Sequence, residues 1–115
     1  MTLSARPARE LAIVTCMDCR LDVLGALGLQ LGDAHVVRNA GGIVTDDVIR
    51  SLALSQHRLG TQEVMVIHHT GCAVEGLDVR DAVRQLRESP LLPHRDQIRG
   101  YIYDTDTHEV TEVGR

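Results

Sequence analysis

Short apolar runs alternate with segments of helical periodicity along the chain. The apolar runs predict buried β-strands at residues 11–15, 34–38, 63–68 and 101–103, and a final short strand near Val110. Apolar residues spaced three and four positions apart predict helices over residues 20–31, 45–60 and 77–87. Gly32, Gly60 and Pro90 suit the ends of these helices. Strands and helices are therefore expected to follow one another in turn.

This alternation predicts an α/β fold with three layers. Right-handed crossovers join successive parallel strands and place helices on the faces of the sheet. We expect a mostly parallel central sheet in the order 2-1-3-4, with a C-terminal strand that folds back as an edge hairpin. The first and third strands are then neighbours, and sheets of this kind bind ligands beyond the carboxyl ends of such strands.

Composition narrows the class of protein. A chain of 115 residues is expected to form one domain, residues 1–115. Phe and Trp are absent, so aliphatic residues must fill the core, and Met17 and Met65 are expected to join it. A net charge of −4 argues against nucleic acid as a partner. No apolar segment reaches the roughly 18 residues of a membrane span, and no signal stretch is evident, so we expect no membrane partner and a cytoplasmic protein.

Side chains that can carry chemistry gather at the ends of both neighbouring strands. Two thiols, a carboxylate and a guanidinium come from Cys16, Asp18, Cys19 and Arg20 at the end of the first, and two imidazoles and a thiol come from His68, His69 and Cys72 at the end of the third. Zinc prefers thiolate and imidazole ligands, and a catalytic zinc site keeps one position open beside three protein ligands. Cys16, His69 and Cys72 form such a set. Three cysteines in a reducing compartment indicate metal or redox chemistry rather than a disulfide framework.

Spacing alone leaves three arrangements open. The first is an open zinc site of Cys16, His69 and Cys72 with a bound water. The second is a closed structural zinc site that also uses Cys19. The third is a redox pair, Cys16-x-x-Cys19, because thioredoxin-like enzymes carry such a pair after a strand.

Asp18 and Arg20 lie at the expected turn between the first strand and the helix that follows. An arginine can hold a carboxylate ionised and fix its orientation through two parallel hydrogen bonds. Asp18 could then accept a hydrogen bond from a zinc-bound hydroxide. The alternative is a salt bridge that only stabilises the turn.

The motifs Cys16-x-Asp18-x-Arg20 and His69-x-x-Cys72 together resemble the signature of the β-class carbonic anhydrases. The strings RNAGG at residues 38–42 and VTDD at residues 44–47 are also similar to that family's second-strand loop and helix start. The resemblance covers residues 11 to 73 and resumes near residues 99–113.

The resemblance implies that Cys16, His69 and Cys72 bind one zinc ion per chain and that Asp18 and Arg20 form a catalytic dyad. In a closed, inactive form of the family, the aspartate corresponding to Asp18 is itself a zinc ligand. The implied activity is that of a lyase, carbonate dehydratase, which hydrates CO2 reversibly to bicarbonate with a zinc-bound hydroxide that the dyad orients. The resemblance also implies a homodimer or a higher even oligomer, with the sites near the subunit interface.

Two alternative functions use the same residues: a COS or CS2 hydrolase of this family, and a non-enzymatic, zinc-stabilised domain. The chain also departs from the usual family pattern. Residues 73–99 form a shorter segment than usual, the N-terminal helical arm is almost absent, and Cys19 replaces a common Ser or Ala. We therefore interpret the chain as a short member of the family.

Overall fold

A computed structural model describes residues 2–114, and in this part of the chain five strands form one sheet in the order β2-β1-β3-β4-β5. The strands are β1 (Leu11–Cys16), β2 (Ala34–Asn39), β3 (Glu63–His69), β4 (Gln97–Tyr103) and β5 (Val110–Glu112). The first four are parallel to their neighbours, and β5 pairs antiparallel with β4. The predicted strand order and the C-terminal edge strand are confirmed.

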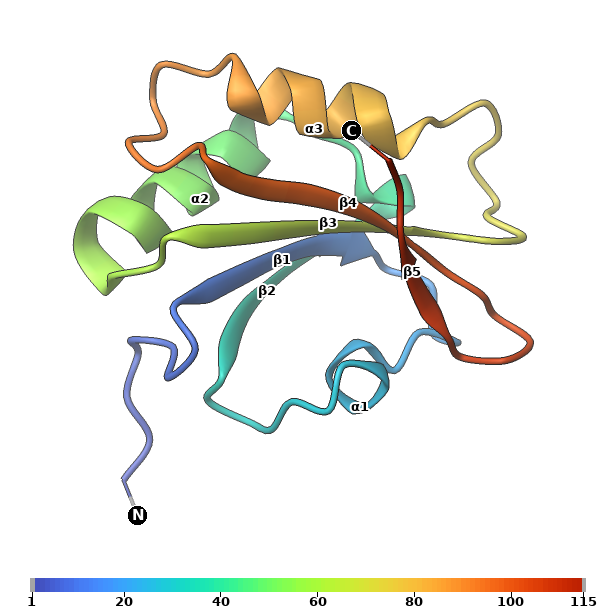
Figure 1. The fold of residues 1–115 in the computed structure, drawn as a ribbon, viewed down its shortest axis with the longest axis horizontal. Helices are drawn as coiled ribbons and strands as arrows, with labels where there is room; N and C mark the ends of the chain where they lie inside the picture. The colour runs from blue at the N-terminus through green and yellow to red at the C-terminus, as the bar shows by residue number, and fades with distance from the viewer. Residues whose placement is uncertain (1, 115) are drawn as a thin grey trace.

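Among the described residues, three helices cover the sheet: α1 (Val23–Ala26), α2 (Asp46–Leu59) and α3 (Val79–Arg87). Helices α2 and α3 lie on one face and α1 lies on the other, which gives the three predicted layers (Figure 1). Thr45 begins α2, because its hydroxyl accepts the Val48 N–H at 3.2 Å, and Gly60 ends it with a φ of 79°. Within the described part of the chain, no helix has the length and apolar character needed to cross a bilayer.

Two apolar clusters fill the space on either side of the sheet. Alternate residues of β1 and β3, such as Val14 and Val66, pack beneath α2 and α3. Their sequence neighbours, such as Ile13 and Ile67, pack on the α1 side together with the fully buried Tyr103. This alternation follows from the twofold side-chain period of a strand. As expected, aliphatic side chains supply most of the core, and Met65 belongs to it.

Of the predicted helix over residues 20–31, only residues 23–26 are helical, so both of its predicted ends are wrong. Asp22 begins α1 by accepting the Gly25 N–H at 3.1 Å, but the helix stops at Ala26. Gly28 then adopts a φ of 69°, which an L-residue rarely takes and which leaves the helical path. The apolar spacing continues past this point, yet Leu31 is 76% exposed.

Met17 was also expected in the core, but it is 65% exposed. It follows the end of β1, where its N–H donates to the Asn39 carbonyl at 2.7 Å and its side chain points away from both clusters. A loop of coil therefore joins β1 to α1, and the chemistry-bearing residues of the first motif lie on it.

Candidate metal centre

Strand pairing brings the two predicted motifs to one place. β1 and β3 are parallel neighbours, with Thr15 opposite Ile67, so Cys16 and His69 end adjacent strands at the same edge of the sheet. The buried Thr15 hydroxyl donates to the Ile67 carbonyl at 2.8 Å and fixes this register one residue before Cys16. The strand pairing and this hydrogen bond therefore place Cys16 close to His69.

Cys16, His69 and Cys72 form a compact group of atoms that could hold a metal ion, called the metal-binding group below. Their ligand atoms all lie within 4.8 Å of one another. Cys16 and His69 are buried, whereas Cys72 is half-buried, so the group has one side toward solvent. Cys19 is exposed and lies outside the group, and all three cysteines are unpaired. This arrangement matches the open set of three ligands. It does not include Cys19 as a fourth ligand, and Cys16 and Cys19 do not form a disulfide.

The hydrogen bonds of His69 leave one ring nitrogen available for a cation. Nδ1 lies 2.8 Å from the Thr70 carbonyl, and because a carbonyl only accepts, Nδ1 carries the proton. Nε2 is buried and has no hydrogen-bond partner among the described residues. An unpartnered buried nitrogen is costly, and here its lone pair lies within 4.8 Å of two sulfur atoms. The donor set therefore fits a thiophilic divalent cation.

The surroundings of Cys16 favour its thiolate. Burial raises the pKa of the Cys16 thiol, but hydrogen bonds from the backbone at Asp18 and Gly41 and the nearby His69 ring lower it further than burial raises it. The Gly41 N–H lies 3.3 Å from the sulfur. The net pKa of Cys16 is below its usual value, and the thiolate is the form that binds metals.

Asp18 and Arg20 form the paired arrangement that their spacing suggested. Arg20 Nε donates to Asp18 Oδ1 at 3.0 Å and Arg20 Nη2 donates to Oδ2 at 2.7 Å. These bonds, with a third from the Arg20 N–H, hold the pKa of the Asp18 carboxyl well below its usual range. Asp18 Oδ2 lies 3.9 Å from His69 Nε2. The carboxylate thus stands beside the metal-binding group, bound to Arg20.

Arg38 stabilises the loop that carries this pair, a role that the sequence did not reveal. Its guanidinium donates to the carbonyls of Cys16 at 2.8 Å and of Asp18 at 2.7 Å, with a longer bond of 3.5 Å to Leu21. The sequence marked Arg38 only as part of a family-like string. Its acceptors are backbone carbonyls, which no pattern of side chains shows.

A short turn, η1 (Ala40–Gly42), supplies the Gly41 N–H that points at Cys16. Asn39 holds the turn with two hydrogen bonds of 2.9 Å to the backbone of Ile43. Gly42, at a φ of 64°, packs so closely on β1 that a Cβ would lie 3.1 Å from the Thr15 carbonyl carbon. His68 points to the opposite side from His69 and its Nε2 lies 3.1 Å from the Gly42 carbonyl, while burial lowers its pKa. His68 is a packing residue of this turn.

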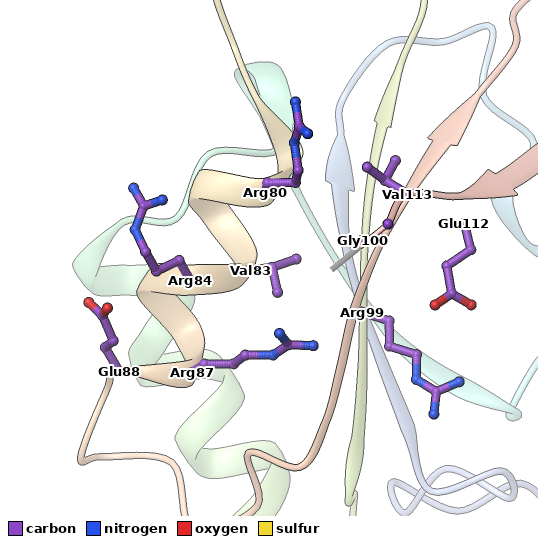
Figure 2. A pocket seen from close by; sticks show the side chains of 10 residues that line it. Arg80, Val83, Arg84, Arg87, Glu88, Arg99, Gly100, Glu112 and Val113 are labelled. Carbon is purple, nitrogen blue, oxygen red and sulfur yellow. The ribbon is translucent and has the colours of Figure 1, made fainter.

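A cavity of about 260 Å³ adjoins the metal-binding group and is lined by Gly41, His69, Cys72 and Leu77, among others. Another cavity, of about 410 Å³, lies elsewhere, between α3 and the β4–β5 edge. Figure 2 shows Arg80, Arg84 and Arg87 on α3 at one side of it and Arg99 and Glu112 at the other.

Three of the four arginines of this second cavity have partners within the fold, and the fourth, Arg99, donates from Nη2 to Gln97 Oε1 at 3.2 Å while its buried Nε has no hydrogen-bond partner among the described residues. Arg80 pairs with Asp78 and Arg84 pairs with Asp81, while Arg87 donates to the Ile98 carbonyl at the edge of β4. The smaller cavity is therefore the one that belongs to the candidate site, because it alone of the two is lined by His69 and Cys72.

Comparisons with known proteins agree with this geometry. A family model described as carbonic anhydrase matches residues 11–99, which include both motifs. Beta-carbonic anhydrase 1 of Mycobacterium tuberculosis is 40% identical over 138 aligned positions, covering 93% of this chain and 83% of that protein. The chain therefore belongs to the β-carbonic anhydrase family of lyases. The 138 aligned positions exceed the 115 residues of this chain, so the mycobacterial protein carries insertions relative to it.

Solved structures show the same fold. The carbonic anhydrase of Streptococcus mutans superposes with a TM-score of 0.93 at 44% identity, covering 99% of this chain and 87% of that one. A further relative in sequence is the carbon disulfide hydrolase of Saccharolobus solfataricus, which is 48% identical over 74% of this chain and 47% of that protein. The family thus includes relatives named for two different substrates.

Replacing Arg38 by Lys should destabilise the protein by about 1–2 kcal/mol, because an ammonium group cannot reach three carbonyls as the planar guanidinium does. Arg50→Lys is the matched control, since Arg50 makes only an exposed ion pair with Asp47, and it should change stability by less than about 0.5 kcal/mol. The free energy of unfolding in urea measures both. Equal effects of the two variants would show that Arg38 does not hold the loop.

Proposed function

We propose that this chain catalyses the reversible hydration of CO2 to bicarbonate at a zinc ion held by Cys16, His69 and Cys72. The observation that carries the proposal is the buried, unpartnered His69 Nε2 beside two sulfur atoms, in a chain of the β-carbonic anhydrase family. Two thiolates and an imidazole are ligands that zinc accepts while keeping a fourth position for exchange. Zinc bound here would lower the pKa of a water molecule and supply a nucleophile near neutral pH.

The roles of the protein groups follow from their hydrogen bonds. His69 donates a hydrogen bond from Nδ1–H to the Thr70 carbonyl, and this bond fixes the direction of the Nε2 lone pair. The Gly41 N–H donates to Cys16 and favours its thiolate form. Cys72 is half-buried and completes the set on the side of the 260 Å³ cavity. These three residues would bind the zinc ion, and backbone groups orient Cys16 and His69.

Asp18 orients the attacking oxygen. Because Arg20 keeps the carboxyl ionised, Asp18 can only accept hydrogen bonds. A hydroxide or water O–H group near His69 Nε2 would donate a hydrogen bond to Asp18 Oδ2. A lone pair of the donating oxygen would then face the substrate. The same two bonds to Arg20 oppose a swing of Asp18 onto the metal, the arrangement that would close the site.

The assembly proposed here is one domain, residues 1–115, that forms a homodimer or a higher even oligomer. β2 lies at an edge of the sheet, and the apolar side chains of Val36 and Leu31 near it are 38% and 76% exposed. An open edge with exposed apolar residues favours pairing with a second copy. Sedimentation of the purified chain tests this, and a monomer at micromolar concentration would contradict it.

The second candidate function is hydrolysis of CS2 or COS. It is favoured by the 48% identity to a carbon disulfide hydrolase over 74% of this chain. Both reactions would use the same residues, so substrate turnover decides between them. Parallel assays with CO2, COS and CS2 on the zinc-loaded protein separate the two, and zinc binding without turnover of any of them would indicate a non-enzymatic domain.

Replacing Asp18 by Asn should lower kcat/KM for CO2 hydration by at least about 100-fold while zinc stays bound, because the amide no longer offers an ionised acceptor. Stopped-flow measurements of CO2 hydration provide the rates. Asp47→Asn removes a comparable carboxylate from an exposed ion pair and should leave the rate unchanged. Unchanged hydration by Asp18→Asn would remove Asp18 from the mechanism.

Replacing Cys72 by Ala should abolish stoichiometric zinc, whereas Cys19→Ala should retain one ion per chain. The reason is that Cys72 belongs to the group of ligand atoms and Cys19 is exposed outside it. Elemental analysis after dialysis against a weak chelator measures the metal content. Loss of zinc from the Cys19 variant would instead support a closed site with three thiolates.

A further inference from the structure

The hairpin between β4 and β5 contacts the turn that follows β3. Residues 104–109 reverse the chain at the carboxyl end of the parallel strands (Figure 1). The Thr105 N–H donates to Thr70 Oγ1 at 3.0 Å, and the two threonine hydroxyl oxygens are also 3.0 Å apart. The Thr70 N–H donates to the Tyr103 carbonyl at 3.0 Å. Thr70 is therefore bonded to the hairpin through both its backbone and its side chain.

Thr70 is also bonded to the metal-binding group. Its carbonyl accepts the Nδ1 proton of His69 at 2.8 Å, which sets the tautomer and the direction of the ring. The next carbonyl, that of Gly71, accepts from Arg20 Nη2 at 3.0 Å. A shift of the turn at residues 70–71 would thus move the imidazole and the guanidinium together. Gly71, at a φ of 62°, gives this turn little stiffness of its own.

The hairpin is itself firmly held. The Asp104 carbonyl accepts the His108 N–H at 2.7 Å, and the Asp104 N–H donates to the Glu109 carbonyl at 2.9 Å. The hydroxyl of the buried Tyr103 accepts the Asp22 N–H at 3.3 Å and is hydrogen-bonded to His108 Nδ1 at 2.6 Å. The same hairpin therefore also contacts the loop that follows Arg20. These hydrogen bonds hold Thr105 in a defined position.

We propose that Thr105 is a positioning residue for the metal centre, acting through Thr70 on His69. The inference rests on the proposed function, because it requires His69 Nε2 to be a zinc ligand. Removing a group that orients a metal ligand lowers the metal affinity or the activity about 10–100-fold. Thr105 lies outside residues 11–99, the segment that the family model matches, so this contribution comes from the C-terminal hairpin.

Three variants test the contact. Thr105→Val removes one of the two bonds to the Thr70 hydroxyl and keeps the side-chain shape, and Thr70→Val removes both. We expect Thr105→Val to raise the zinc dissociation constant about 10-fold, which is the low end of the effect of such groups. Thr70→Val should raise the dissociation constant by at least as much. The double variant should have the same zinc dissociation constant as Thr70→Val alone, because Thr70→Val already removes the contact that Thr105→Val weakens. Competition with a chromophoric chelator gives the zinc dissociation constants.

A spectroscopic measurement and two controls separate positioning from general loosening. The visible absorption bands of the Co2+-loaded protein report the ligand field, and they should shift in Thr105→Val and return in Thr105→Ser, which restores the hydroxyl. Thr107→Val alters the same hairpin, but the Thr107 hydroxyl accepts only from the Glu109 N–H at 3.3 Å. Its zinc affinity and cobalt spectrum should equal those of the wild type.

Two results would overturn the positioning role while leaving the proposed function intact. One is a Thr105→Val variant with wild-type zinc affinity and cobalt spectrum. The other is a Thr107→Val variant that weakens zinc binding as much as Thr105→Val, since the effect would then belong to the hairpin as a whole. A wild-type chain that binds no zinc would overturn both proposals at once.

Discussion

The direct parallel pairing of β1 with β3 is the constraint on which the rest of the site depends. The chain leaves β1, forms β2 on one side of it and returns through α2 to form β3 on the other side. Cys16 and His69 thereby end neighbouring strands, and the Thr15–Ile67 hydrogen bond fixes their relative height. A one-residue slip would turn every side chain of one strand to the opposite face. The apolar alternation on both faces opposes such a slip.

Backbone groups define the geometry of the site as much as side chains do. Arg38 binds carbonyls of the loop after β1, and the Gly41 N–H faces the Cys16 sulfur. Carbonyls of the turn after β3 fix His69 and Arg20. Cys16, His69 and Arg20 are thus each oriented by a peptide group of the backbone around them. Substitutions other than proline keep these peptide groups, but the groups move when the segment that carries them moves.

Much of the fold and the site could be predicted from the sequence, because both rest on local patterns. Apolar runs located the strands, and the strand order followed from the helical crossovers. The grouping of Cys16, His69 and Cys72 then required only that β1 and β3 be neighbours. The pairing of Asp18 with Arg20 was suggested by their position at the turn after β1, whereas a catalytic role for the pair was implied by the family resemblance.

The failures have physical causes that side-chain patterns do not contain. The spacing of leucines predicted a long helix after residue 20, but Gly28 leaves the helical path and the pattern has no structural counterpart there. Met17 was expected in the core because it is apolar, although it follows the last residue of β1 and faces solvent. Arg38 and Thr105 were missed because their roles depend on backbone acceptors and on a contact between distant turns.

The separation of the three candidate ligands along the chain has a consequence for biosynthesis. Cys16 leaves the ribosome before α2, whereas His69 and Cys72 follow only after the whole of α2. The three side chains of the candidate metal centre therefore come together only once β3 has docked against β1. A cation captured at that stage would join the ends of two central strands and stabilise the folded chain by mass action, more strongly as its free concentration rises. Depletion of the ion in a growing cell would accordingly lower the amount of folded protein as well as its turnover.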